Sequence, residues 1–215
     1  TRHKSNGKTE MWYVVAADKG AHLKSGFSQQ LTPAEYERMV ADHTLTDALC
    51  DYPVTAGDLF FLPAGRVHAI CAGTFVAEIQ QTSDITYRIY DYGRTGADGK
   101  PRELHTELAK DAIDYTVLPD YRTHYTPAQN CGVELVSCPY FTTTLYDLTQ
   151  ARTIDLSSLD SFLVVICMGG HATLSTDGGD PMPVHQGETV LVPASARTLR
   201  IEPEGGAKFL TSCIR

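Results

Sequence analysis

The sequence has no Cys-x-x-Cys pair, no long apolar run and no excess of positive charge. Its six cysteines are scattered along 215 residues, so we expect reduced, buried thiols rather than a disulfide framework. Lys and Arg number 18 against 26 Asp and Glu, which gives a formal net charge of -8. Nucleic acid is therefore excluded as the main partner, because phosphate backbones require a basic surface.

Signals for membranes and export are lacking too. No apolar run approaches the roughly 20 residues of a membrane-spanning helix, and there is neither a signal-peptide pattern nor an Asn-x-Ser/Thr sequon. The sequence therefore predicts a cytoplasmic protein that binds no membrane and no nucleic acid. We expect it to be a monomer or a weak homodimer.

What the chain does contain is an internal repeat. Residues 57–64 (GDLFFLPA) match residues 187–194 (GETVLVPA) at an offset of 130. Each copy has a Gly-acid turn, a short apolar strand and a Pro-Ala stop, which predicts two similar β units in tandem. The copies differ eleven residues after the first glycine, where one has His68 and the other Thr198. Only the first unit keeps this potential metal ligand.

Segments rich in Val, Ile, Thr and aromatic residues, separated by Gly, Pro and Asp, predict strands along most of the chain. One helix interrupts them: Thr32 is suited to the N-cap, Pro33 to the first turn, and Glu35 completes a capping box. Residues 107–113 predict a second, short helix. The predicted strands are 11–16, 21–27, 58–62, 67–71, 74–81, 85–91, 133–138, 141–147, 162–167, 171–176, 189–192, 197–202 and 207–213.

Many short strands at regular spacing indicate a sandwich or barrel, and the G-[DE]-x-x-x-x-P signature favours the cupin jelly roll. The predicted fold class is mainly β, with two tandem cupin barrels and a small helical insertion in the first. We expect residues 1–125 to form a catalytic cupin that is incomplete at its N-terminus, with the helical insert at about 32–50. Residues 126–215 would form a C-terminal cupin without metal.

Polar residues on the predicted strands could meet inside the first unit. Residues two apart share a face of a strand, and this period aligns Glu10 with Trp12, Glu78 with Gln80, and Arg88 with Tyr90. If these faces and His68 point into one barrel, two carboxylates, an imidazole and a guanidinium converge on a polar pocket. Charged side chains are rarely buried without a partner or a metal.

Plainer interpretations of these residues stay open at this point. A single histidine at the edge of a β unit is more often a hydrogen-bonded structural residue than a metal ligand. Glu10 and Arg88 could be solvated or could form an ion pair. Zinc takes three or four N, O or S ligands, and the spacing identifies only Glu10 and His68 as neighbouring candidates.

Five motifs resemble the type I phosphomannose isomerases, and most closely their short bacterial form. They occur in the order and spacing of that family, and the resemblance extends over essentially the whole chain. The motifs are Gly7–Tyr13 (GKTEMWY), Pro63–Ala69 (PAGRVHA), Glu78–Asp84 (EIQQTSD), Tyr87–Tyr92 (YRIYDY) and Gly99–His105 (GKPRELH).

The resemblance implies a zinc-dependent cupin that interconverts mannose 6-phosphate and fructose 6-phosphate through an enediol. It implies that Glu10 and His68 are zinc ligands, with one Zn²⁺ per chain. The family's other ligands, a Gln and a His from a Q-x-H segment, have no counterpart in this sequence, so we expect them upstream of Thr1. On this basis the chain is a fragment with an impaired metal site and little activity of its own.

The resemblance also implies catalytic roles. Arg88 would stabilise the developing enediolate, Lys8 would take part in proton transfer or ring opening, and Glu78 would orient a ligand or move protons. Arg94 and Arg102 are candidates for holding the substrate phosphate, because planar guanidinium groups suit phosphate oxygens. Longer family members have His before the lysine, where this chain has Gly7, so the proton-transfer base is not assigned.

Other functions remain possible from the sequence. The chain could be a non-catalytic sugar-phosphate-binding module, since a fold does not dictate a function. An iron-dependent cupin oxygenase is disfavoured because the chain has no His-x-His pair. In the second unit Thr198 stands in the place of the histidine and Ser161 is expected in the place of Glu10, so we predict a structural role for that unit.

Overall fold

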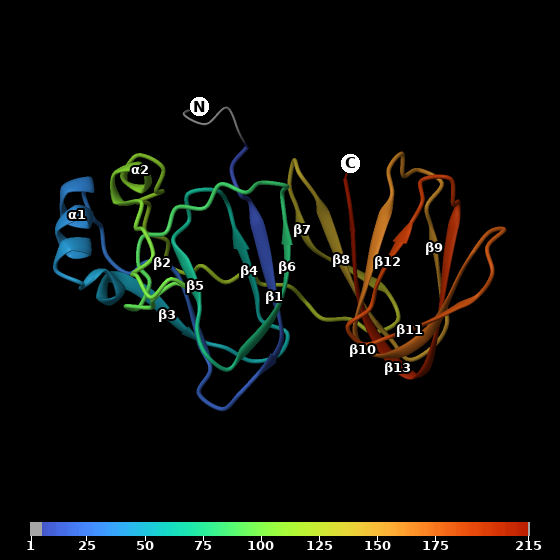
Figure 1. Ribbon diagram of the computed structural model, residues 1–215. Helices are drawn as coiled ribbons and strands as arrows, with labels where there is room; N and C mark the ends of the chain where they lie inside the picture. The colour runs from blue at the N-terminus through green and yellow to red at the C-terminus, as the bar shows by residue number, and fades with distance from the viewer. Residues whose placement is uncertain (1–5, 215) are drawn as a thin grey trace. The chain divides into compact units, whose positions relative to one another are not determined.

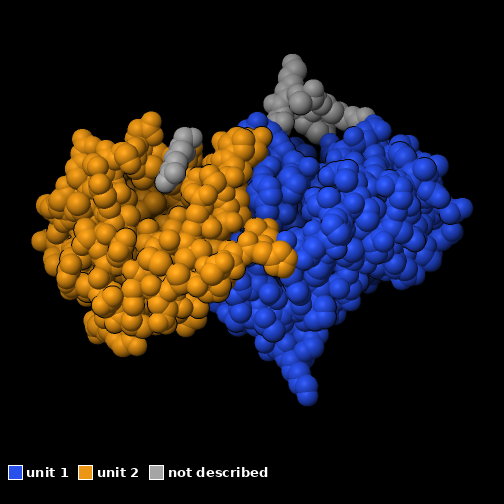
Figure 2. All heavy atoms as spheres, turned by 180° about the vertical axis from the view of Figure 1, so that it is seen from behind, with its two compact units in different colours: residues 1–122 blue, residues 123–215 orange. Residues whose placement is uncertain are grey.

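The computed structural model describes residues 6–214 (Figure 1). Its contacts divide the chain into two compact units, residues 1–122 and 123–215 (Figure 2). The predicted boundary was three residues later. The described residues are mainly β, as predicted, and contain no helix that is long and apolar enough to span a bilayer.

Unit 1 is built on two three-stranded antiparallel sheets, in the orders β4-β1-β6 and β3-β2-β5. A core that includes Trp12, Leu23 and Phe60 draws its side chains from both sheets. The two sheets therefore enclose the hydrophobic interior of the unit between them. The strands are β1 (Glu10–Ala17), β2 (His22–Phe27), β3 (Leu49–Pro53), β4 (Leu59–Leu62), β5 (His68–Ile70) and β6 (Thr74–Gln80).

The helical insertion lies between β2 and β3, as predicted. Helix α1 (Pro33–Ala41) is followed by the 3₁₀ helix η1 (Leu45–Ala48). Thr32 Oγ1 accepts a hydrogen bond from Glu35 N at 3.2 Å, and Glu35 Oε2 accepts one from Thr32 N at 2.8 Å. This confirms the capping box, which satisfies two backbone N–H groups that the helix cannot pair. The short helix α2 (Thr106–Lys110) is also confirmed in position.

Unit 2 is one antiparallel sheet in the order β11-β10-β13-β8-β7, with β12 paired to β10 and β9 paired to β13. Its core draws on most of these strands and includes Leu148, Val165, Leu199 and Phe209. The strands are β7 (Gly132–Ser137), β8 (Thr142–Leu148), β9 (Arg152–Asp155), β10 (Leu163–Thr176), β11 (Met182–His185), β12 (Thr189–Val192) and β13 (Thr198–Cys213).

Two pairs of predicted strands in unit 2 are in fact single long strands. The strands predicted at 162–167 and 171–176 are one strand, β10, which continues through the glycines at 169–170 with register shifts on both sides. Gly170 has φ +74, and a Cβ at this position would lie 2.2 Å from Gly206 O. Glycine here permits a bulge and a close backbone approach rather than a turn.

The predicted strand at 85–91 is wrong, because none of these residues belongs to a strand. The Arg88 N–H donates to His105 Nδ1 at 2.9 Å, and Arg88 O accepts from His105 N at 2.8 Å. These bonds connect the segment to the residues before α2 instead of to a sheet. The prediction also missed β3, β9 and β11, which are short.

The internal repeat forms the same turn in both units. The Asp58 carboxylate accepts a hydrogen bond from Thr55 N at 2.8 Å, and the Glu188 carboxylate accepts one from His185 N at 2.7 Å. In both turns the acidic side chain satisfies the N–H three residues earlier, as Asp commonly does in turns. The acidic position is therefore explained by local structure.

The glycine of the repeat is also explained locally. Gly57 has φ +97 and Gly187 has φ +88, a left-handed conformation that L side chains rarely adopt. Gly57 N donates to Val14 O at 2.8 Å, and Gly187 N donates to Cys167 O at 2.9 Å. The turn thus leads the backbone into a strand that pairs with an earlier one: β4 pairs with β1 in unit 1, and β12 pairs with β10 in unit 2.

We expect Gly187→Ala to lower the free energy of unfolding by about 1 kcal/mol, because the left-handed conformation is costly for alanine. No atom lies within 4 Å of the added Cβ, so the backbone alone would cause the loss. Gly169→Ala is the matched control: its Cβ would also meet open space, without positive φ. Urea denaturation of both variants checks this, and equal losses would contradict it.

Candidate active site

The most unusual side chain of unit 1 is the carboxylate of Glu10, at the start of β1. Glu10 lies between Leu62 of β4 and Gln80 of β6, and its side chain is 1% exposed. A buried carboxylate is costly unless cations and hydrogen bonds compensate for the lost hydration. Its neighbours therefore define the candidate site.

Lys8 joins two carboxylates at this position. Its Nζ lies 2.6 Å from Glu10 Oε2 and 2.7 Å from Glu78 Oε1. Glu78 faces Trp12 across the pairing of β1 with β6, and Trp12 Nε1 donates to Glu78 Oε2 at 3.0 Å. The donor role of Trp12 was not predicted, although its shared strand face with Glu10 was a signal for it.

His68 approaches the other oxygen of the buried carboxylate. Its Nε2 lies 3.0 Å from Glu10 Oε1, and its Nδ1 lies 2.7 Å from the carbonyl oxygen of Arg66. Because a carbonyl only accepts, we assign the proton of a neutral ring to Nδ1. In that neutral form Nε2 points a lone pair at Glu10 Oε1, which accepts no hydrogen bond from another described residue. A proton on Nε2, which makes the ring a cation and a hydrogen-bond donor, or a metal ion would join the two atoms.

The two groups fit one edge of a metal site. Ligands about 2.0–2.1 Å from a tetrahedral zinc ion lie about 3.3 Å apart, close to the 3.0 Å between His68 Nε2 and Glu10 Oε1. However, the described residues contain no group of three or more His, Cys, Asp or Glu that could hold a metal. The pair therefore accounts for only two of the three or four ligands that zinc takes in proteins.

The charges at the site are defined by these contacts. Burial raises the pKa of Glu10, but the hydrogen bonds and charges of His68 and Lys8 outweigh it and lower the pKa to about 2. Burial lowers the pKa of Lys8, but its hydrogen bonds to Glu10 and Glu78 outweigh this and raise it. At neutral pH Lys8 is thus a proton donor in this arrangement, not a base.

The predicted convergence of Arg88 on these residues is not found. Arg88 lies outside any strand and its Nη1 donates to Glu103 O at 3.0 Å. It forms no ion pair with Glu10 or Glu78 within residues 6–214. The strand period that aligned Arg88 with the pocket does not apply, because the segment has no strand geometry.

Arg94 and Arg102 meet at a carboxylate that the sequence analysis did not single out. Arg94 Nη2 lies 3.1 Å from Asp91 Oδ1, and Arg102 Nε donates to Asp91 Oδ2 at 2.7 Å while its Nη2 contacts Oδ1. The Asp91 side chain is 7% exposed, whereas those of Arg94 and Arg102 are 64% and 38% exposed. Asp91 thus groups two guanidinium ions whose outer N–H groups face solvent.

Strand register identifies the equivalent positions in unit 2. Glu10 pairs with Leu62, and Leu163 pairs with Val192. Because Leu62 and Val192 hold the same place in the repeat, Leu163 is the counterpart of Glu10. The prediction that Ser161 takes this place is wrong, because the offset between β1 and β10 is 153 residues rather than 151.

The same register places neutral residues at the other site positions. Glu78 pairs with Trp12 and Thr211 pairs with Val165, so Thr211 is the counterpart of Glu78. With the offset of 153, Ser161 is the counterpart of Lys8, and Thr198 already matches His68. Unit 2 thus has no acidic or basic residue at these four positions.

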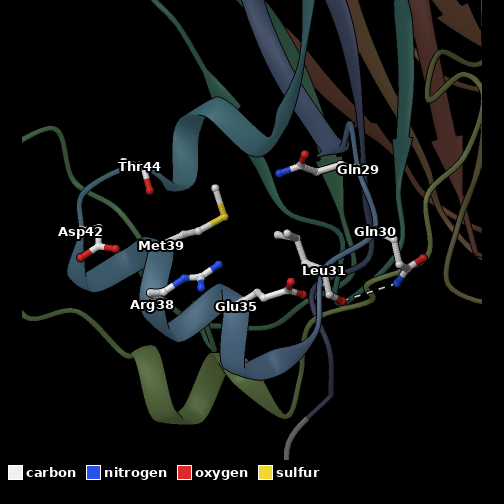
Figure 3. A pocket seen from close by; sticks show the side chains of 8 residues that line it. All are labelled: Gln29, Gln30, Leu31, Glu35, Arg38, Met39, Asp42 and Thr44. Atoms are coloured by element: carbon white, nitrogen blue, oxygen red, sulfur yellow. Dashed lines mark hydrogen bonds between the residues drawn. The ribbon is translucent and has the colours of Figure 1, made fainter.

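A separate hollow of about 380 Å³ lies beside α1 and shares no residue with the cluster around Glu10 (Figure 3). Gln29, Gln30, Arg38 and Asp42 are among its lining residues. Gln30 Nε2 contacts Leu31 O at 3.4 Å. This hollow is wide and polar but contains no buried ionised group, so it is the weaker candidate for catalysis.

Comparison with known proteins agrees with the predicted resemblance. Residues 133–213 match the family described as mannose-6-phosphate isomerase, cupin domain. The mannose-6-phosphate isomerase of Streptococcus mutans is 31% identical over 199 residues, which cover 91% of this chain and 61% of the relative. Mannose-6-phosphate isomerase ManA of Bacillus subtilis is 31% identical over 198 residues, covering 91% and 62%. The chain thus spans about three fifths of the length of these curated relatives.

Solved structures confirm the cupin-type fold. The crystal structure of mannose 6-phosphate isomerase from Bacillus subtilis matches with a TM-score of 0.86 and 26% identity, covering 99% of this chain and 66% of that one. A mannose 6-phosphate isomerase described as holo and zinc bound matches with a TM-score of 0.74 and 12% identity, covering 100% and 69%. The chain is thus similar in sequence to bacterial mannose-6-phosphate isomerases and shares their fold.

We expect Lys8→Met to lower the free energy of unfolding by about 2–3 kcal/mol, because the buried Glu10 carboxylate would lose its nearest cation. Lys110→Met is the matched control, since Lys110 also joins two glutamates, Glu37 and Glu107, neither of which is buried. Adding Glu10→Gln to Lys8→Met should restore part of the loss. Chemical denaturation measures all three variants, and similar effects of the two lysine substitutions would contradict the prediction.

The ion pairs of Asp91 with Arg94 and Arg102 can be tested by comparing the thermal stability of Asp91→Asn and of the wild type at different pH values. The hydrogen bond from Arg102 is the main cause that lowers the pKa of Asp91, so this carboxyl stabilises the fold above its ordinary pKa. That contribution disappears as the pH falls through the lowered pKa. The Tm difference between wild type and variant should therefore shrink from about pH 7 to about pH 3. Exposed Asp84, in Asp84→Asn, is the control; a constant difference for Asp91→Asn would contradict the prediction.

Proposed function

We propose that this chain, a relative of the short bacterial type I mannose-6-phosphate isomerases, carries a zinc-dependent aldose-ketose isomerase site. The reaction would interconvert mannose 6-phosphate and fructose 6-phosphate. One observation supports this above the others: His68 Nε2 lies 3.0 Å from an oxygen of the buried Glu10 carboxylate, while His68 Nδ1 lies 2.7 Å from the carbonyl oxygen of Arg66. This places an imidazole nitrogen and a carboxylate oxygen where one cation could bind both, and Glu10 and His68 would be the zinc ligands.

The reaction moves a proton between C2 and C1 of the sugar through an enediol. When bound, zinc would polarise the substrate oxygens and so stabilise negative charge that develops on them. The protein must also supply a group that accepts a proton from carbon and one that donates to oxygen. Groups of both kinds lie beside Glu10.

Glu78 and Lys8 are suited to the two proton-transfer roles. The Glu78 side chain is 33% exposed and accepts hydrogen bonds from Lys8 and Trp12, so it is an oriented carboxylate that substrate can reach. Lys8 carries a proton between two carboxylates and could donate it to a substrate oxygen while it keeps one of these contacts. We assign Glu78 as the candidate base and Lys8 as the candidate acid.

The arginines would act on the substrate's negative groups. The solvent-facing N–H groups of Arg94 and Arg102, held together by Asp91, suit a phosphate. Arg88 would stabilise charge on the enediolate. Since Arg88 contacts Glu103 O, this role requires its guanidinium to turn toward the substrate when the sugar binds.

We expect calorimetric titration to show weak zinc binding by the chain, because two ligands fall short of a full set. Glu10→Gln and His68→Gln should each weaken it further, by at least about tenfold. His185→Gln is the matched control, since His185 also lies beside a glutamate, Glu188, at the surface. Unchanged zinc affinity in both site variants would overturn the assignment of the ligands.

We expect the 215-residue chain to turn over mannose 6-phosphate poorly, and a version extended at its N-terminus with a Q-x-H segment to regain activity. A coupled assay for fructose 6-phosphate, with and without a chelator, measures both. Full turnover by the shorter chain would contradict the argument from ligand number.

The second candidate is a sugar-phosphate-binding module without catalysis. It is favoured by the absence of a third metal-ligating side chain near Glu10 and His68 within the described residues. This function requires mannose 6-phosphate to bind equally well with and without the chelator, and the extended version to remain inactive.

A further inference from the structure

Unit 2 contains a cavity at the place that corresponds to the charged site of unit 1. The cavity has a volume of about 100 Å³ and lies among β8, β9, β10, β13 and the loop after β9. Leu163 and Thr211, the counterparts of Glu10 and Glu78, both line it. Cys213 also lines it and is the counterpart of Gln80, since each pairs with the first residue of its partner strand. The cavity thus lies at the positions that correspond to the charged site of unit 1, with neutral residues in place of Glu10, Glu78 and Gln80.

Two buried residues that line this cavity have hydroxyl groups without a partner among the described residues. Thr211 is 4% exposed and Tyr146 is 9% exposed, and neither side chain makes a hydrogen bond to any other residue within 6–214. Thr143, on the opposite face of the same sheet, donates to Ser212 Oγ at 3.2 Å. Neither of the two hydroxyl oxygens is among the buried atoms without a partner, so both are accessible and can donate to or accept from a ligand in the cavity that they line.

The chemistry of the walls selects a neutral ligand. The one charged residue that lines the cavity is Asp155, and its hydrogen bonds from Ser157 lower its pKa, so it repels anions at neutral pH. Burial raises the pKa of Tyr146, which keeps the phenol protonated as a donor. Leu163, in the place of Glu10, gives an apolar wall for C–H groups.

The volume limits the size of the ligand. On this scale a single buried water needs about 10–15 Å³, so the cavity holds several groups of that size. It is smaller than the roughly 300 Å³ at which pockets for drug-sized molecules begin. From the volume, the two unpartnered hydroxyls and the apolar wall, we propose that unit 2 binds a small neutral polyol of three or four carbon atoms.

The test uses glycerol and erythritol as probes and follows the methyl resonances of the whole chain by NMR. We expect shifts centred on the methyl groups that line the cavity, among them those of Thr144, Leu163 and Thr211. Thr211→Val and Tyr146→Phe, which remove one hydroxyl each and keep the shape, should each weaken binding about fivefold or more. Thr143→Val is the matched control and should leave the affinity unchanged, since its hydroxyl lies on the other face.

The Tm of each ligand-free variant shows whether a loss of binding comes from a loss of folding. Thr211→Val should keep or raise the Tm of the ligand-free protein, because the hydroxyl it removes has no protein partner, whereas Thr143→Val should lower it. Glycerol 3-phosphate, the charged probe, should bind at least about tenfold more weakly than glycerol. The proposal is overturned if neither neutral probe shifts the cavity methyl groups, if both hydroxyl variants bind as wild type does, or if the phosphate binds equally well.

Discussion

The architecture of unit 1 depends on how one buried carboxylate is neutralised. Glu10 is held between two strands, and its side chain is 1% exposed, so burial alone would favour protonation. Lys8 contacts one of its oxygens and His68 the other. These contacts outweigh burial and keep the carboxylate ionised. The atoms that stabilise the buried carboxylate are therefore also those of the potential metal site. Loss of Lys8 or His68 would affect both the stability of unit 1 and its capacity to bind a metal.

The repeat shows how one scaffold carries two chemistries. The turn with Gly and an acidic residue is built by the same backbone hydrogen bonds at Gly57 and at Gly187. Neither its glycine nor its acid takes part in the site. The positions that differ are on the strands, where Leu163 replaces Glu10 and Thr211 replaces Glu78. Scaffold and site thus vary independently, so unit 2 has a cavity at these positions without the charged residues of unit 1.

Much of the fold could be predicted because it rests on local preferences. Thr32 and Glu35 form the expected capping box, since both partners lie within one turn of helix. The strand expected at 85–91 failed for a non-local reason: the backbone of Arg88 pairs with His105, seventeen residues later. Residue preferences indicate which segments can adopt the extended conformation of a strand. Which group each backbone N–H bonds to depends on the rest of the fold.

For the site, the sequence by itself determined the residue types, the order of the motifs and the pairing of Glu10 with His68 as candidates. Only the tertiary structure decided that Lys8 bridges two carboxylates, that the Arg88 side chain contacts Glu103 O, and that Leu163 rather than Ser161 matches Glu10. The physical reason is that strand register and side-chain contacts join residues far apart in the chain. A shift of one residue exchanges the faces of a strand, and only the folded chain fixes that shift.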